Sequence, residues 1–244
     1  MDLNKLSNQI RINTLLAIYY AKSGHPGGSL SSVDILTSLF FNEMNLAFSK
    51  EKKLLKDRFI LSKGHAVPAL YATGLELGLL DYKELIGFRK INHSLQGHPN
   101  RNSTPWVEAS TGSLGQGFSF AIGEAVGFKH KKEDFRVYVM TGDGELQEGE
   151  IWEGAMYAGH NKLNNLCAII DYNKLQSDDL NSNIVSLEPL ADKWKAFNWN
   201  VIEIDGHDFF EIEEAFKNAK AETTKPTVII ANTIKGKGVS FMEG

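Results

Sequence analysis

The sequence has little of what marks a secreted, membrane or nucleic-acid-binding protein. Its one cysteine, Cys167, cannot form an internal disulfide, and it lies in an apolar run typical of a buried strand. Lys and Arg number 26 against 30 Asp and Glu, and no block of one sign argues for nucleic acid or an anionic membrane as partner. No apolar run approaches the roughly 20 residues that span a bilayer, and the start of the chain does not resemble a signal peptide. We therefore expect a cytoplasmic protein.

Repeats, low-complexity stretches and Pro/Ser-rich linkers are also missing, so we expect residues 1–244 to form a single domain. Short β-branched or apolar runs predict buried strands at Arg58–Leu61, Arg136–Met140, Leu166–Asp171, Val201–Ile204 and Thr227–Thr233. Helical spacing predicts helices at Ala66–Leu77, Gly115–Lys129, Glu150–His160 and Phe209–Ala221. This alternation predicts an α/β fold, doubly wound, with a mainly parallel sheet and helices on both faces.

The first 40 residues predict two helices with a glycine-rich loop between them. Apolar residues at helical spacing from Ile10 to Tyr19 indicate an opening helix, which Gly24–Gly28 ends. Ser31–Asp34 has the composition of a helix start. The loop is therefore expected to be held between two helices.

Oxygen-bearing side chains follow two of the predicted strands. Asp143 stands in Gly-Asp-Gly after the strand that ends at Met140, and Asn173 follows the next strand. Ligands of doubly wound sheets bind at the carboxyl ends of strands, and small hard cations prefer oxygen ligands. Asp143, Asn173 and a nearby backbone carbonyl could therefore hold a Mg²⁺ that bridges diphosphate oxygens. The alternatives are a tight turn at Gly-Asp-Gly and an Asn that only braces its loop.

Three histidines directly follow glycine in loops: His25, His65 and His98. One Gly-His alone favours a turn histidine bonded to the backbone. Three such loops beside a metal site instead predict a pocket in which histidines bind phosphate or sugar hydroxyls and exchange protons. The remaining histidines are interpreted as surface or packing residues, with His207 in a loop that caps the following helix.

A second glycine-rich turn, Thr111–Gly117, runs into a predicted helix. Its glycines allow close approach of a flat cofactor ring, and Leu114 offers an apolar contact. Tight packing of a helix start against the sheet explains the same residues, and this alternative stays open.

Taken together and in order, these motifs resemble transketolases: Gly-His-Pro-Gly-Gly, Ser-Lys-Gly-His-Ala, Gly-Ser-Leu-Gly-Gln-Gly, Gly-Asp-Gly-Glu-Leu-Gln-Glu-Gly and Asp-Tyr-Asn-Lys-Leu. The resemblance extends from about Ile10 to Phe241 and concerns the N-terminal, diphosphate-binding half of that family. It implies thiamine diphosphate and Mg²⁺ as cofactors, with Ca²⁺ or Mn²⁺ able to substitute. It places the metal on Asp143, Asn173 and the carbonyl of Leu175.

The resemblance also implies roles for further residues. His25, His65 and His98 would line the substrate channel as catalytic residues. Glu148 and Glu153 match acids near a subunit interface, and Ser113 stands where many relatives have proline. The cofactor-binding residues implied in this way are His65, Gly112, Ser113, Leu114, Asp143, Gly144, Glu145 and Asn173.

The family's pyrimidine-binding domain, with the Glu that activates the cofactor, has no counterpart before Gly244. A Trp-His-Gly segment of relatives is likewise missing, either by truncation or because that histidine is absent. The resemblance thus implies one subunit of a split transketolase, which pairs with a separate C-terminal subunit to form a heterotetramer. The pair would transfer a two-carbon ketol unit between sugar phosphates. Open alternatives are a 1-deoxyxylulose-5-phosphate synthase-like enzyme, a dehydrogenase first component, and a non-catalytic cofactor-binding subunit.

Overall fold

A parallel sheet forms the centre of the computed structural model, which describes residues 1–46 and 57–244. The described residues form one five-stranded sheet in the order β1-β2-β3-β5-β4, with every neighbouring pair parallel. Its strands are β1 (Arg58–Leu61), β2 (Val137–Gly142), β3 (Leu166–Tyr172), β4 (Asn200–Asp205) and β5 (Thr227–Asn232). The five predicted strands are confirmed, with ends that shift by one or two residues.

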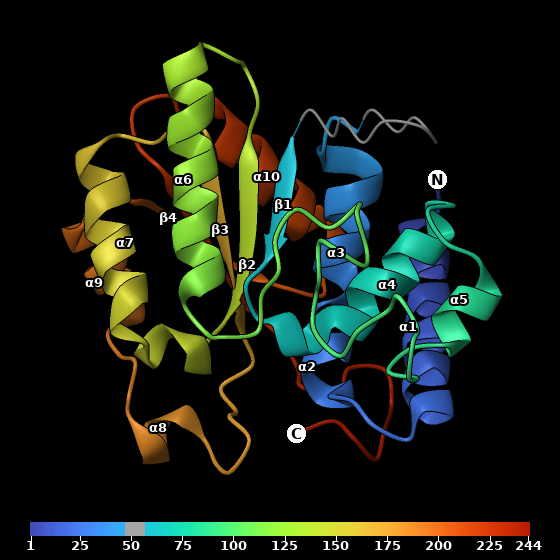
Figure 1. Ribbon diagram of the computed structural model, residues 1–244. Helices are drawn as coiled ribbons and strands as arrows, with labels where there is room; N and C mark the ends of the chain where they lie inside the picture. Colours follow the sequence, from blue (N-terminus) through green and yellow to red (C-terminus); the bar gives the residue numbers. More distant parts are fainter. Residues whose placement is uncertain (47–56) are drawn as a thin grey trace.

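The strands alternate their side chains between two apolar layers. In β2, Tyr138 and Met140 join one buried cluster, whereas Val137 and Val139 join the other. The first cluster is completed by α1, α3, α4 and α10, and the second by α6, α7 and α9. Figure 1 shows α6, α7 and α9 on one side of the sheet and α1, α3 and α4 on the other. The doubly wound parallel fold is confirmed, and Cys167 is buried in β3 as predicted.

Most long helices lie where apolar periodicity predicts them. The helices are α1 (Leu3–Ala21), α2 (Pro26–Leu30), α3 (Val33–Ser38), α4 (Val67–Glu76), α5 (Tyr82–Ile86), α6 (Gln116–Lys131), α7 (Gly149–His160), α8 (Asn181–Ile184), α9 (Leu190–Ala196) and α10 (Phe209–Ala221). Short 3₁₀ segments cover Gly64–Ala66 and Gly144–Gln147, and a π-helical turn covers Leu39–Glu43. No helix of the described residues is long and apolar enough to cross a membrane.

The glycine-rich segment after α1 differs from the prediction. Instead of a loop through Gly28, the chain turns into α2 at Pro26. Proline is favoured at a first helical position because its φ is already helical and its missing N–H has no helical partner there. The Ser29 hydroxyl also donates to the His25 carbonyl, 2.7 Å away, which supports this turn. The helix leaves His25 just outside its start.

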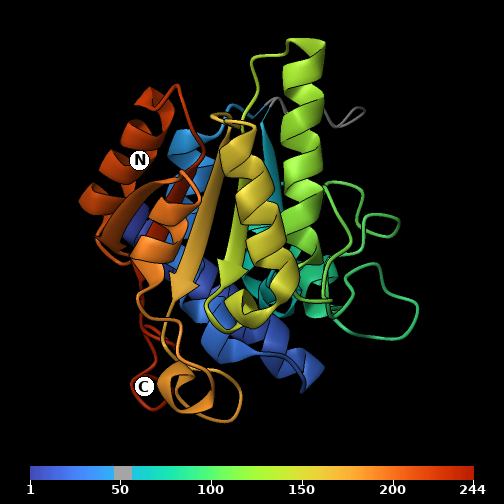
Figure 2. The same cartoon turned by 90° about the vertical axis from the view of Figure 1, so that its left-hand side faces the viewer.

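The register of the sheet brings the ends of three strands level. Gly142 of β2 is paired with Asp171 of β3, and Asp171 is paired with Ala231 of β5. The residues that follow these positions must therefore emerge side by side at one edge. In Figures 1 and 2 this carboxyl edge faces the end of the molecule where α2 and α8 lie.

Candidate functional site

A pocket of about 620 Å³ opens at the carboxyl edge of the sheet. It is lined by the loop and start of α2, the residues after β1, the residues after β2 and β3, and the segment after β5. Predicted site residues in the lining are His25, His65, Leu114, Asp143, Gly144, Glu145, Asn173 and Leu175. The fold therefore gathers most of the predicted residues into one cavity.

Asp143 lies at the pocket, and within residues 1–46 and 57–244 its carboxylate is hydrogen-bonded by backbone amides alone. Its Oδ1 accepts from the Gly144 N–H at 2.8 Å, and its Oδ2 accepts from the Lys174 N–H. The residue is 2% exposed. Burial, and next the negative charge of Asp171, raise the pKa of Asp143 to about 6. A carboxylate in these surroundings gains stability from an added cation.

Asn173 and Leu175 lie in the neighbouring loop after β3. The Asn173 amide nitrogen donates to Asp171 Oδ2 at 3.3 Å, and its Oδ1 accepts from the Leu175 N–H at 3.1 Å. These bonds fix which end of the amide carries the oxygen. An oxygen keeps a second lone pair after accepting one hydrogen bond, so Asn173 Oδ1 still has capacity for a metal ion. The free lone pair of Asn173 Oδ1 and the nearby Asp143 carboxylate are oxygen ligands of the kind that a hard cation prefers.

Within residues 1–46 and 57–244, no three His, Cys, Asp or Glu side chains come together in a group able to hold a metal ion. The predicted ligand set has one such side chain, Asp143, beside an amide and a backbone carbonyl. Mixed oxygen sets of this kind are those that Mg²⁺ accepts when a substrate phosphate and water complete its shell.

A buried ion pair that the sequence reasoning missed lies beneath the pocket. The Lys63 ammonium bonds to Asp171 Oδ2, to the Gly28 carbonyl at 2.8 Å and to Ser32 Oγ at 3.1 Å. Asp171 also accepts from the hydroxyls of Ser31 and Thr233. Burial opposes the charge on Asp171, but the nearby Lys63 and these donors hold its pKa below the usual range. The pair links β1, the α2 region, β3 and the end of β5.

A sequence signal for this pair exists. Lys63 precedes the glycine of Ser-Lys-Gly-His-Ala, two residues after β1, and Asp171 is the last residue but one of β3. Charged residues at the ends of otherwise apolar strands need partners when buried.

Two of the three predicted histidines pack together in the pocket. The rings of His25 and His65 lie edge to face with centroids 5.3 Å apart. Burial, and next the Lys63 ammonium, lower the pKa of His65 to about 3. Burial and the Arg89 guanidinium lower the pKa of His25 and of His98. Near pH 7 these rings are therefore neutral and can both donate and accept hydrogen bonds.

Of the turn before α6, Leu114 lines the pocket, whereas the predicted residues His98, Gly112 and Ser113 do not. A Cβ on Gly112, whose φ is +141°, would come within 2.9 Å of the His98 ring. Gly64 is similarly close to this turn, because its Cβ would lie 2.9 Å from the Gly112 nitrogen. Ser113 is exposed, and Leu114 presents its side chain to the pocket with 36% exposure. The close approach supports both earlier interpretations of the turn: tight packing, and an apolar contact facing the cavity.

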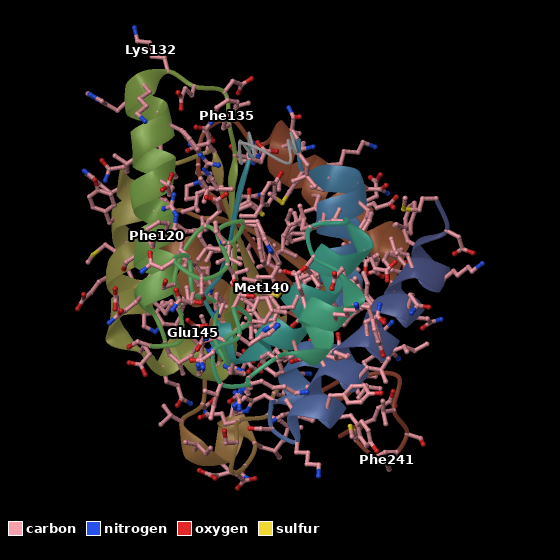
Figure 3. The ribbon with its side chains drawn as sticks, turned by 45° about the vertical axis from the view of Figure 1, so that its right-hand side comes forward. Phe120, Lys132, Phe135, Met140, Glu145 and Phe241 are labelled. Atoms are coloured by element: carbon pink, nitrogen blue, oxygen red, sulfur yellow. The ribbon has the colours of Figure 1, made fainter. Side chains whose placement is uncertain are left out.

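Glu145 braces loops around the pocket. Its carboxylate accepts from Ser62 Oγ and from the N–H groups of Gly115, at 2.9 Å, and Gly142, at 3.0 Å. Burial raises its pKa, and these donors offset part of the effect. Figure 3 shows Glu145 near the carboxyl edge and Met140 farther inside. Both oxygens thus already have protein partners, whereas Glu148 and Glu153 are exposed on α7 and at its start.

Besides Lys63, the lining contains Lys235 and Gln176, which the sequence did not single out. Lys235, after β5, donates from Nζ to the Gln176 carbonyl at 2.7 Å. The buried Nε2 of Gln176 has no hydrogen-bond partner among the described residues. Lys235 follows a predicted strand, and that placement was the available signal. Together they supply an ammonium and an unused amide donor to the cavity.

The remaining histidines lie outside the pocket lining. His93 is half-buried, and its Nδ1 accepts from the Leu95 N–H at 3.2 Å. His130 and His160 are exposed at the ends of α6 and α7. The surface and packing interpretation fits all three.

Comparison with known proteins assigns the chain and its fold to a family. The family described as "Transketolase, thiamine diphosphate binding domain" matches residues 3–244. A transketolase from Leishmania mexicana superposes with a TM-score of 0.92 at 32% identity, over 98% of this chain and 38% of that one. A Campylobacter jejuni transketolase gives 0.90 at 33% identity, over 99% and 39% of the two chains. The chain is therefore a thiamine-diphosphate-binding domain by fold and sequence.

Curated relatives divide into short subunits and full-length enzymes. The chain is 43% identical to a 6-deoxy-6-sulfo-D-fructose transketolase subunit of a Clostridium species, over all of this chain and 89% of the relative. It is 40% identical to an apulose-4-phosphate transketolase subunit of Phocaeicola vulgatus, of which it covers 86%. Against rat transketolase it is 41% identical but covers 38% of that protein. The chain belongs to the transketolase family, and its extent matches relatives that are separate subunits.

Proposed function

We propose that this chain binds the diphosphate end of thiamine diphosphate through Mg²⁺ and acts as the N-terminal subunit of a split transketolase. The observation that carries the proposal is Asp143: a buried carboxylate at the edge of the sheet, held by amides and with no cationic side chain bonded to it among the described residues. Such a group favours a divalent cation, and a cation there would attract a diphosphate.

The metal would be held by Asp143, by Asn173 Oδ1 and by the Leu175 carbonyl. Asp171 supports this set from behind, because it orients the Asn173 amide. Ca²⁺ or Mn²⁺, which also take oxygen ligands, could substitute.

The diphosphate itself would find donors around the metal. Gln176 Nε2 is unpartnered among the described residues, and the Lys235 ammonium is beside it. A Cβ on Gly144 would meet the Gln176 side chain at 2.9 Å, so the glycine keeps this part of the cradle open. His65 is within the same cavity. Gly112, Ser113, Leu114 and Glu145 would contact the cofactor, with Leu114 facing its thiazolium and aminopyrimidine region.

When bound, the cofactor supplies carbanion stabilisation to the reaction. The chain's own residues would bind and orient the sugar. Partial desolvation and nearby cations lower the pKa values of His25, His65 and His98, so the neutral rings can hydrogen-bond sugar hydroxyls or accept a proton. Leu114 would give an apolar contact that excludes water from one side of the pocket.

The partner would be a separate chain that carries the pyrimidine-binding domain, and two copies of each would form a heterotetramer. The reaction would move a two-carbon ketol unit from a ketose phosphate to an aldose phosphate. Support comes from relatives named as subunits for a sulfonated and a phosphorylated sugar. Both names specify an anionic group on the sugar, so sulfonated and phosphorylated ketoses are the donors to screen.

The test is calorimetric titration of thiamine diphosphate with Mg²⁺ into the chain, alone and mixed with the candidate partner subunit, followed by a donor and acceptor screen of the mixture. Asp143→Asn keeps the shape of the side chain and one oxygen ligand but removes its charge. Since ligand charge tunes cation affinity, we expect Mg²⁺-dependent binding to weaken about 10- to 100-fold.

Asp192→Asn removes the same charge from an exposed site on α9 and serves as the matched control. Unchanged affinity in Asp143→Asn would reject the metal assignment. Absence of ketol transfer by the loaded mixture with every sugar phosphate and sugar sulfonate tested would reject the transketolase activity.

A further inference from the structure

His207 lies between β4 and α10, outside the pocket, and both its ring nitrogens have partners. Nδ1 is 2.8 Å from Asp34 Oδ2, and Nε2 accepts from the Ile234 N–H at 2.8 Å. A backbone amide can only donate, so Nε2 carries no proton and Nδ1 donates to Asp34. The two partners therefore fix both the tautomer and the orientation of the ring.

The loop that contains His207 caps α10, as the sequence analysis expects, and the cap is made by the residue after His207. Asp208, not His207, caps α10, because its carboxylate accepts from the N–H groups of Phe210 and Glu211. The His207 side chain instead points to other elements, and it is 9% exposed. A nearly buried ring with two hydrogen bonds is a rigid connection.

Asp34 anchors this ring to the helical layer. It lies on α3 and also binds the guanidinium of Arg11 from α1. Burial alone would raise the pKa of Asp34, but the hydrogen bond from His207 and the charge of Arg11 hold it below its ordinary value. Asp34 is thus a buried, charged hydrogen-bond acceptor, and it fixes His207 through the Nδ1–H group of the ring.

The other end of the connection reaches the pocket. Ile234 directly precedes Lys235, whose ammonium bonds to the Gln176 carbonyl in the cavity lining. On the far side of Lys235, the Gly236 N–H donates to the Gly27 carbonyl at 3.0 Å. The backbone of Lys235 is therefore held at one side by His207 and at the other by Gly27.

We propose that His207 is a positioning residue for diphosphate binding, which acts by holding the Ile234 amide so that the Lys235 ammonium stays in the pocket. This inference rests on the proposed function, because it assigns Lys235 to the diphosphate. The chain from Asp34 through His207 to Ile234 links two helices to the cofactor pocket without contacting the ligand.

Two substitutions separate the two hydrogen bonds of the ring. His207→Asn keeps an N–H for Asp34 but is too short to accept from Ile234, whereas His207→Gln places a carbonyl oxygen near the position of Nε2. We expect amide exchange at Ile234 in the full chain to become roughly tenfold faster in His207→Asn and to stay near the wild-type rate in His207→Gln, since the hydrogen bond to the Ile234 amide is lost only in the first. This measurement needs no ligand.

Titration with inorganic diphosphate and Mg²⁺ measures the consequence in the pocket. We expect affinity to fall about threefold to tenfold in His207→Asn and to change little in His207→Gln. The decisive comparison is the same substitution made in a Lys235→Met background. If His207 acts through Lys235, His207→Asn has no further effect there, because the two changes remove one shared contribution.

His160→Asn, at an exposed position on α7, is the matched control and should alter neither readout. Equal loss of affinity from His207→Asn with and without Lys235, or a loss without faster exchange at Ile234, would overturn the inference and leave the proposed function intact. Failure of the wild-type chain and of its mixture with the partner to bind diphosphate or thiamine diphosphate with Mg²⁺ would instead reject the proposed function.

Discussion

Asp143 and Asp171 follow or end neighbouring strands at the same edge of the sheet, and both are almost fully buried, with 2% and 0% exposure. Asp171 has an ammonium and two hydroxyls around its carboxylate, and its pKa is lowered. Asp143 has two backbone amides and faces the charge of Asp171, and its pKa is raised to about 6. Two equally buried carboxyl groups thus have pKa values shifted in opposite directions, because the charges nearest to them differ.

Asp171 is a structural carboxylate, whereas Asp143 is the carboxylate that we propose to bind a cation. Asp171 has a cation within the fold, so the protein alone stabilises its charge. Asp143 lacks such a bonded cation among the described residues, and under the proposed function its charge would be stabilised by a cation that enters the pocket. Removing the hydrogen-bonding and ionic partners of Asp171 should therefore destabilise the fold. At Asp143, by contrast, the negative charge of the carboxylate itself should lower stability when no metal is bound.

Lys63→Met should have the largest effect on stability. The substitution keeps the length of the side chain but leaves the Asp171 carboxylate buried without its cation, which costs about 3–5 kcal/mol of unfolding free energy. Chemical denaturation of the full chain measures this loss. The double variant Lys63→Met/Asp171→Asn should recover a large part of it, because no uncompensated charge remains.

A loss below about 1 kcal/mol in Lys63→Met would show that Asp171 does not depend on the ammonium. Lys195→Met, which removes an exposed ammonium paired with Asp192, is the matched control and should change stability little.

The pH dependence of the metal-free chain should show the opposite behaviour at Asp143. Its pKa is raised from 3.8 to about 6, so the native state retains a proton that the unfolded state has released between these values. The stabilisation is present below pH 4 and is lost as pH rises through 6, by about 3 kcal/mol in all. Asp143→Asn has no such group, so the difference between the two chains isolates the effect.

The measurement is denaturant unfolding of wild type and Asp143→Asn from pH 4 to 7.5 with a chelator. Wild type should lose stability relative to the variant as pH rises, and added Mg²⁺ should restore part of that loss at pH 7.5. A difference that does not change with pH would mean that Asp143 ionises in the native chain at its ordinary pKa.

The sequence indicated that Asp143 lies at a site at the end of its strand, but it did not indicate the partner of Asp171. Asp143 stands between glycines after an apolar strand, so its local pattern alone indicates an exposed turn or a ligand site. The role of Asp171 depends on Lys63, 108 residues away in the chain, and no local pattern shows which cation a buried carboxylate will meet. The parallel strands were predictable because each is a short continuous apolar run.

The positions of Lys235, Gln176 and His207 could not be predicted from local sequence patterns either. Each is positioned by a contact between distant segments: Lys235 by Gln176 and Gly27, and His207 by Asp34 and Ile234. The sequence missed helix α2 for another reason, which is that its local signals disagree. Gly27 and Gly28 favour a loop by propensity, while Pro26 and the Ser29 hydroxyl favour a turn of helix.

Ser31→Ala gives the smallest effect and tests how the surroundings of Asp171 share its charge. The Ser31 hydroxyl donates to Asp171 at 2.7 Å, but Lys63 and Thr233 remain after its loss. We expect stability to fall by about 1 kcal/mol in denaturant unfolding. Ser38→Ala is the matched control, since the buried Ser38 hydroxyl has no hydrogen-bond partner among the described residues, and its removal should leave stability unchanged or slightly higher. If both variants lost the same stability, the hydroxyl of Ser31 would contribute through packing alone, and the low pKa of Asp171 would rest on Lys63 and Thr233.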